Sequence, residues 1–150
     1  MKKHDVVVAG YTCVDLTPGF RRTDTPVSIA DLFRPGKLIE IDGLDVSLGG
    51  IVPNTGLALK KFGKRVFFNG LIGDDAIGMI AKETFDRYGV SEGITTTGKA
   101  GTAFSIVISP PGVDRIFLES PGCNTILDRE NIDFDAVSQS RTFHFGYPPL

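Results

Sequence analysis

The sequence lacks a long run of basic residues. Lys and Arg number 16 and Asp and Glu number 18, which gives a formal net charge of −2, and the charges are mixed along the chain. Proteins that bind nucleic acid normally carry a basic patch or stripe that meets the phosphates. The sequence therefore argues against a nucleic-acid partner, although a few backbone amides could still hold a phosphorylated ligand.

Cysteines are few, and a long hydrophobic run is missing near the N-terminus. The two cysteines, Cys13 and Cys123, lie far apart and form no CxxC pair, so we expect reduced thiols. The apolar run from Val6 to Tyr11 has no more than six residues. It is too short for the core of a signal peptide or for a membrane span. We therefore expect a soluble, cytoplasmic protein with no membrane partner.

Two phosphate-binding motifs are also absent. The sequence contains no GxxxxGK[ST] loop, and no GxGxxG follows its first strand-like segment, which has a single glycine at its turn. A dinucleotide-binding Rossmann domain is therefore a poor interpretation. The two histidines, His4 and His144, are too far apart to suggest a metal pair, and we assign no metal ligand.

The first half of the chain alternates between strand and helix patterns. Residues 6–9 are a β-branched run, apolar on both faces, which is typical of a central strand in a covered parallel sheet. A helix with Pro53 in its first turn, a strand over 65–69 and a second helix capped by Asp74 or Asp75 follow. This order predicts an α/β fold with right-handed crossovers. The apolar stripe expected on the first helix comprises Leu57, Ala58, Lys61 and Phe62.

The second half predicts short strands. Residues 94–97, 102–109 and 115–119 alternate between apolar and polar side chains, and the last two form a plausible hairpin. Residues 17–37 contain three Pro and mixed charge, which predicts a loop excursion with one short helical turn. Residues 142–146 predict one more strand of the sheet. A parallel sheet that finishes on a strand leaves apolar surface open.

Three segments carry a resemblance to a known family. They are AGYTCVDL (9–16), SLGGIVPNTGLALKKFGKRVFFNGLIGDDAIG (47–78) and PGCN (121–124). In this order they resemble the N-terminal half of the ribokinase-like, or PfkB, carbohydrate kinases, over nearly the whole chain. The second segment is the specific one, because Gly-Gly, Asn and Gly-Asp-Asp follow one another at set spacings. Departures from the family pattern at Cys13, Ile51, Val52 and Gly56 bear on the substrate more than on the fold.

The resemblance implies a Rossmann-like ribokinase fold, a mostly parallel sheet flanked by helices with a small β-sheet lid over the sugar. Residues 1–150 would form the N-terminal part of one kinase domain, with lid strands near 14–20, 37–48 and 94–119. The lid strands could also join two copies into a homodimer. In the family the catalytic base and the nucleotide pocket come late in the chain, and nothing in 125–150 resembles them. We therefore expect the C-terminal part of the fold to be absent and assign no catalytic residue.

The resemblance also implies which residues contact the substrate. On the family pattern Asp15, Gly50 and Asn54 would meet sugar hydroxyls, with Gly49 beside them and Asn124 on the substrate side. The residue types suit this role, because a carboxylate accepts two hydroxyl protons, Asn donates and accepts, and glycine admits a close approach. Simpler interpretations stay open: Asn54 could cap the helix, and Asp15 and Asn124 could be turn residues.

The implied activity is transfer of the γ-phosphate of ATP to a hydroxyl of a sugar or nucleoside, with Mg²⁺ in the complete protein. This chain would supply the substrate-binding half and the lid, and we expect it to be inactive alone. The alternative, from another class, is a non-catalytic sugar-binding or interaction module whose lid strands pair with a partner by edge addition.

Overall fold

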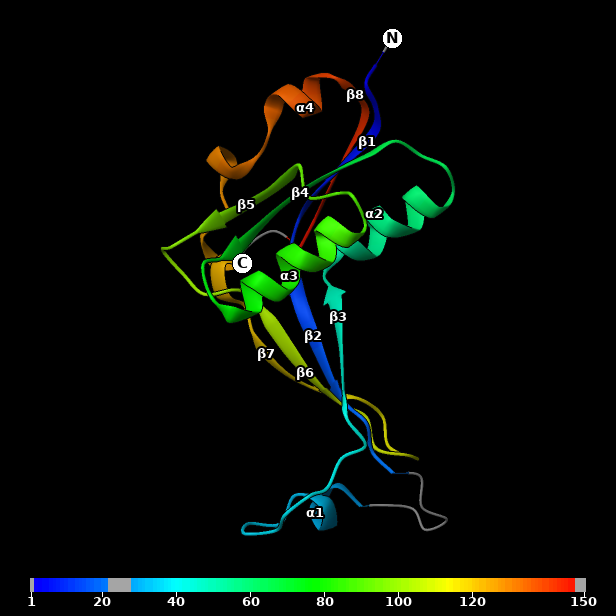
Figure 1. Ribbon diagram of the computed structural model, residues 1–150, viewed down its shortest axis with the longest axis vertical. Helices are drawn as coiled ribbons and strands as arrows, with labels where there is room; N and C mark the ends of the chain where they lie inside the picture. Colours follow the sequence, from blue (N-terminus) through cyan, green and yellow to red (C-terminus); the bar gives the residue numbers. More distant parts are fainter. Residues whose placement is uncertain (1, 22–27, 148–150) are drawn as a thin grey trace.

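The computed structural model describes residues 2–21 and 28–147, which build two sheets of four strands each (Figure 1). The first sheet has the order β5-β4-β1-β8 and is parallel throughout, and the second has the order β3-β2-β6-β7. The strands are β1 His4–Gly10, β2 Cys13–Pro18, β3 Leu44–Gly49, β4 Val66–Gly73, β5 Gly93–Thr97, β6 Phe104–Ile108, β7 Ile116–Ser120 and β8 Ser140–Gly146. The helices are α1 Ile29–Leu32, α2 Ile51–Lys61, α3 Ala76–Arg87 and α4 Phe134–Ser138, with 3₁₀ turns at Gly122–Ile126 and Arg129–Asn131.

Strand β1 is central in the first sheet because it is apolar on both faces. It lies between β4 and β8, where Val7 pairs with Phe67 on one side and with Phe143 on the other. Val7 and Phe67 pack against Ala136 of α4, while Phe68 on the opposite face packs against α2 and α3. The predicted α/β fold, a parallel sheet flanked by helices with a second small sheet, is therefore confirmed.

The buried face of α2 differs from the predicted stripe. The buried residues are Val52, Pro53 and Gly56, whereas Phe62 is 77% exposed at the end of the helix. A Cβ on Gly56 would overlap the ring of Phe68, so the absence of a side chain lets α2 lie directly on β4. The closeness of this contact turns the face with Gly56 inward. The predicted stripe was wrong for Ala58, Lys61 and Phe62, which are exposed, whereas Leu57 packs against the core.

The second sheet takes only parts of the ranges expected for the lid. Strand β2 runs antiparallel to β3 and parallel to β6, and β6 and β7 form the expected hairpin. Residues 37–43 form no strand, and β5 lies in the first sheet, parallel to β4. The lid range predicted at 94–119 therefore begins too early: residues 94–97 belong to β5, which follows α3 and returns to the first sheet as a crossover strand.

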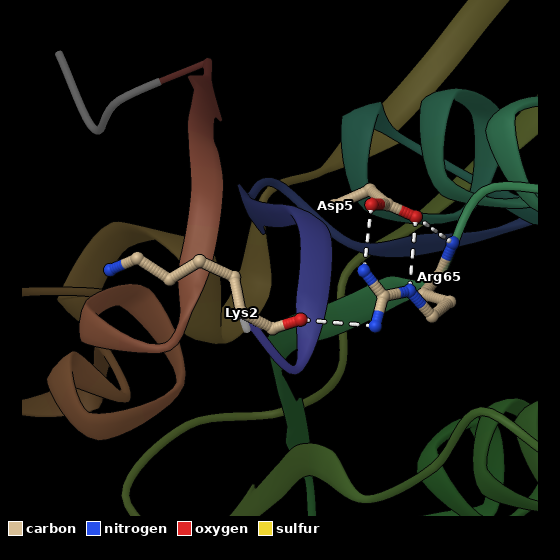
Figure 2. A network of polar contacts seen from close by, with 3 residues as sticks. All are labelled: Lys2, Asp5 and Arg65. Carbon is tan, nitrogen blue, oxygen red and sulfur yellow. Dashed lines mark hydrogen bonds and ion pairs between the residues drawn. The ribbon is translucent and has the colours of Figure 1, made fainter.

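Asp5 and Arg65 join the beginning of β1 to the beginning of β4 (Figure 2). Nη2 and Nε of Arg65 donate to the two carboxylate oxygens of Asp5 at 2.9 and 3.2 Å, and the backbone N–H of Arg65 donates at 2.9 Å. Nη1 of Arg65 donates to the carbonyl of Lys2 at 3.0 Å. The hydrogen bonds from the Arg65 side chain and backbone lower the pKa of Asp5 from 3.8 to about 2.

The outer edge of the first sheet carries exposed aromatic rings. Phe143 and Phe145 of β8 stack with centroids 6.1 Å apart and remain 42% and 41% exposed. The apolar surface expected beside the last strand is therefore open. Across the described ranges, the helices are all too short or too polar to cross a bilayer.

Candidate functional site

The chain passes from the first sheet to the second through Tyr11 and Thr12, directly after β1. Gly10 has φ +125°, and a Cβ there would overlap the carbonyl oxygen of Gly146, so this turn requires glycine. Strand β2 then begins at the carboxyl end of β1. In open parallel sheets the carboxyl ends of the strands are where ligands bind.

A cavity of about 930 Å³ opens at this junction. It is bounded by residues that follow β1, by the first turn of α2, by one face of the second sheet and by the 3₁₀ turn at Gly122–Ile126. Four of the predicted site residues line it, namely Asp15, Gly50, Asn54 and Asn124. Its volume is in the range of small-molecule sites.

Asp15 presents a carboxylate to the cavity from the middle of β2. Burial raises its pKa; the Cys13 thiol, which donates to Oδ1 at 3.6 Å, opposes this rise, and the negative charge of Glu119 adds to it. Within the described ranges this thiol is the one side-chain donor to Asp15, so the carboxylate keeps acceptor sites for a ligand. The carboxylate is therefore half-buried and incompletely satisfied.

Gly49 and Gly50 have no side chain at positions where a Cβ would collide with the Asp15 carboxylate or with the backbone of Tyr11. Gly49 does not line the cavity, but a Cβ on it would overlap the carboxylate of Asp15. Gly50 has φ +87° and lies so close to the carbonyl oxygen of Tyr11 that a side chain there would collide with it. Both positions need glycine, Gly49 to seat Asp15 and Gly50 to begin α2 at the rim of the cavity.

Asn54 lies in the first turn of α2, and its side chain does not cap the helix. Gly50 occupies the N-cap position, where no side-chain capping bond forms. Among described residues the Asn54 amide makes no side-chain hydrogen bond, whereas its backbone N–H donates to Gly50 at 3.2 Å. The amide can therefore donate to and accept from a ligand hydroxyl.

Asn124 holds the junction between the sheets. Its Oδ1 accepts from the backbone N–H of Thr12 at 3.1 Å, and its Nδ2 donates to the carbonyls of Thr12 at 2.9 Å and Pro121 at 3.2 Å. Both donor sites of the amide are thus used by backbone. Asn124 lines the cavity, but its geometry is that of a structural clamp with little capacity left for a ligand.

Strand β7 contributes residues that sequence reasoning missed. Phe117 and Glu119 of β7 line the cavity from one face of the second sheet, together with Arg115, which directly precedes the strand. Glu119 pairs with Ser105, and Ser105 pairs with Asp15, so these three form a row across the sheet. The alternation is visible in the sequence, but which face meets Asp15 depends on strand pairing.

Tyr11 links the junction to β7. Its hydroxyl donates to Glu119, and its ring meets Tyr147 edge-on with centroids 6.3 Å apart. Burial and the bond to Glu119 raise the pKa of Tyr11, which keeps the phenol protonated as the donor. Glu119 is thereby held in the cavity wall beside Asp15.

Three other polar side chains, those of Asp75, His4 and Lys37, lie outside the cavity. Asp75 caps α3 by accepting from the backbone N–H of Gly78 at 2.7 Å, and it also accepts from Thr102. Burial opposes ionisation of Asp75, but the hydrogen bonds from Thr102 and Gly78 outweigh it and lower the pKa. His4 is buried against Phe67, and Lys37 donates to the carbonyl of Asp31. These side chains have structural roles.

The described residues contain no cluster of side chains that could ligate a metal ion. No group of three His, Cys, Asp or Glu side chains among them is placed to hold a metal ion. The cavity contains two carboxylates, Asp15 and Glu119, and one of these is engaged by Tyr11. No step of a reaction is therefore assigned to ATP or Mg²⁺ on these residues.

Comparisons with known proteins give relatives but no match to a family model. The chain is 28% identical to Probable fructokinase-4 of Arabidopsis thaliana over 97% of this chain and 41% of that kinase. It is 24% identical to a 5-dehydro-2-deoxygluconokinase of Clostridium perfringens over 93% of this chain and 39% of that kinase. The chain thus spans about two fifths of the length of these relatives.

Solved structures share the fold. A ribokinase of Thermotoga maritima superposes with a TM-score of 0.73 at 20% identity, over 93% of this chain and 44% of that one. A fructokinase of Xylella fastidiosa with bound ATP gives a TM-score of 0.68 at 21% identity, over 95% of this chain and 42% of that one. The resemblance to the N-terminal half of the ribokinase-like (PfkB) carbohydrate kinases is therefore confirmed as a similarity: the curated relatives are sugar kinases, and the solved structures share the fold.

Proposed function

We propose that this chain supplies the substrate-binding half and the lid of a kinase that transfers the γ-phosphate of ATP to a hydroxyl of a sugar or nucleoside. The observation that carries the proposal is the cavity shared by Asp15 of β2 and Asn54 of α2. Their side chains come from segments far apart in the sequence, and each retains hydrogen-bonding capacity toward a ligand. The names of the relatives, which are fructose, ribose and dehydrodeoxygluconate kinases, support a sugar substrate.

The residue chemistry supports recognition of hydroxyl groups. The carboxylate of Asp15 would accept from two neighbouring hydroxyls, and the Asn54 amide would donate to one oxygen and accept from another. Gly50 would allow the ring to approach the backbone at the beginning of α2. Gly49 would seat Asp15 and Asn124 would hold the junction, so that both act on the substrate through their neighbours.

The second sheet would act as the lid. It contributes Asp15 and the β7 residues to one side of the cavity, while α2 and the first sheet contribute the other. Closure of a lid excludes water from a transferring phosphoryl group. The catalytic base, the ATP site and the Mg²⁺ site would be formed by residues other than those described.

Calorimetry tests the binding half of the proposal. The protein would be titrated with fructose, ribose, a nucleoside and a sugar acid, as wild type, as Asp15→Asn and as Asp74→Asn. Asp74 is an exposed carboxylate outside the cavity, so its variant controls for the loss of one charge. We expect one compound to bind, and Asp15→Asn to weaken it about 10-fold or more, as for a lost hydrogen bond to a charged group.

Two results would contradict the proposal: no binding by any compound, or equal binding by Asp15→Asn. Phosphorylation is tested separately, by ADP production from the complete protein with ATP, Mg²⁺ and the bound compound. Binding without ADP production would favour a non-catalytic sugar-binding module instead.

We also propose that two copies associate through the second sheet. Its face opposite the cavity carries a cross-strand row of apolar side chains, Val46, Leu16, Ile106 and Leu118. Val46 is 40% exposed and Leu118 is 52% exposed. Exposed apolar patches of this kind mark interaction surfaces, and a second copy would cover this one with its own identical row.

A further inference from the structure

The cavity has an unequal distribution of charge that points to a feature of its occupant. Asp15 and Glu119 lie in one row across the second sheet, close to the junction with the first sheet. Arg115 lines the same cavity directly before β7, four residues before Glu119, which is about 13 Å at 3.3 Å per residue of extended chain. The cavity is therefore acidic at its inner end and basic at its outer end.

Arg115 is not committed to a partner within the protein. Across the described ranges its guanidinium forms no ion pair and no side-chain hydrogen bond, whereas Arg21, Arg34 and Arg65 each pair with a carboxylate. Its contact is with the ring of Phe117, whose centroid lies 5.7 Å from Cζ. A guanidinium stacked on an aromatic ring keeps its donor edge free and loses little entropy when it binds a ligand.

We propose that the substrate carries an anionic group, a carboxylate or a phosphate, which Arg115 binds at the end of the cavity away from Asp15. The planar guanidinium matches either group with two parallel N–H···O bonds. The carboxylates of Asp15 and Glu119 repel an anion from the inner end, so the charge of the substrate fixes which end of it enters first. The inference rests on the proposed sugar-binding function and narrows it to sugar acids or sugar phosphates.

Calorimetry with matched ligands tests this inference on the purified protein. The panel pairs a neutral hexose with the corresponding hexonate and with the hexose 6-phosphate, so that the two sources of negative charge are compared separately. The variants are Arg115→Gln, Arg115→Lys and, as control, Arg129→Gln. Arg129 also stacks on a phenylalanine, Phe134, at 5.5 Å, but it does not line the cavity.

The readout is the ratio of affinities for the anionic and the neutral ligand. We expect the wild type to favour one anionic ligand about 10-fold or more, and Arg115→Gln to reduce this ratio to about one. Arg115→Lys should keep part of the preference, because lysine retains the positive charge but cannot form the two parallel N–H···O bonds of a guanidinium. Arg129→Gln should keep all of the preference. Added salt should lower the preference, since the outer end of the cavity is open to solvent.

The inference would be overturned by a wild type that binds the neutral sugar at least as well as both anions, or by a preference that survives in Arg115→Gln. If the neutral hexose binds best and its binding depends on Asp15, the proposed function stands and this inference fails. No binding by any of the three ligands would overturn both.

Discussion

At the scale of single residues, Asp15 combines a favourable position for binding with an unfavourable electrostatic environment. Burial and the nearby charge of Glu119 raise its pKa, which means that the folded protein disfavours the ionised form relative to the unfolded chain. An ionised carboxylate with few donors destabilises the fold, and a ligand hydroxyl would relieve this. Residues with this combination are typical of functional sites.

Replacing Asp15 by Asn should therefore leave the protein as stable as the wild type, or make it more stable, while sugar binding is weakened. The Asn amide is neutral, so its partial burial does not desolvate a charge. The midpoint of thermal unfolding at pH 7 should therefore not fall. Differential scanning fluorimetry measures this, with Asp74→Asn as the control. A clear drop in the midpoint for Asp15→Asn alone would show that its carboxylate stabilises the fold.

The raised pKa also sets the pH dependence of binding. The ionised carboxylate is the acceptor for hydroxyls, so affinity should be full above the raised pKa and fall as the pH drops through it. Because the pKa lies above the ordinary value of 3.8, the loss should begin at a higher pH than for a free aspartate. Calorimetry from pH 7.5 downward should show this loss in the wild type, and a flat profile in Asp15→Asn would assign it.

The residues of the site were predictable from the sequence to different degrees. Gly50 and Asn54 belong to the segment with a specific spacing, Asp15 belongs to a segment that is useful only in order with it, and all three residues line the cavity. Arg115, Phe117 and Glu119 carry no motif, because their approach to Asp15 comes from the pairing of β7 with β6 and of β6 with β2. The hairpin of β6 and β7 was predicted from the sequence, but the pairing of β6 with the distant strand β2 cannot be deduced from local alternation.

At the scale of elements, the contact between α2 and β4 depends on Gly56. Gly56→Ala adds a methyl group against the ring of Phe68 and should destabilise the protein by about 1–2 kcal/mol, since overpacking costs about 1–3 kcal/mol and the gain in helix propensity returns up to about 1. Urea denaturation measures the change. Gly98→Ala is the matched control, because open space surrounds that position and the change should stay within about 0.5 kcal/mol.

The ion pair of Figure 2 ties two strands together at their beginning, and its contribution should depend on pH. The pKa of Asp5 is lowered to about 2, so the pair stabilises the fold above about pH 4 and its contribution is lost as the pH falls toward 2. Asp5→Asn should lower the unfolding midpoint slightly at pH 7 and not at pH 2. An equal effect at both values would argue against the ion pair, and Glu83→Gln controls for net charge.

Most elements could be predicted locally, and the errors came from packing. The central β1, the helix capped by Asp75 and the β6–β7 hairpin follow from runs, caps and turns in the sequence. The buried face of α2 and the sheet to which β5 belongs do not, because both depend on what lies opposite: the ring of Phe68 and the free edge of β4. The buried face of a helix and the sheet membership of a strand are thus set by tertiary contacts and not by the local sequence.

At the scale of the whole molecule, the apolar row on the second sheet predicts self-association. Leu118→Glu would place a charge at the β7 end of the apolar row that we propose to be covered, and should convert a dimer into a monomer. Light scattering coupled to size-exclusion chromatography measures the mass of both proteins. Met79→Glu is the control for replacing an exposed apolar residue by a charged one, since Met79 is 68% exposed on α3, outside the apolar row of the second sheet. A wild type that is monomeric at high concentration would rule the dimer out.

Of the connections by which the chain passes between the two sheets, the crossing from β1 to β2 is the shortest, because only Tyr11 and Thr12 separate the two strands. A compound that binds both Asp15 of β2 and Asn54 of α2 would bridge the two sides of this crossing and restrict their relative motion. Its arrival should slow deuterium uptake at the amides beside the crossing far more than in the centre of either sheet.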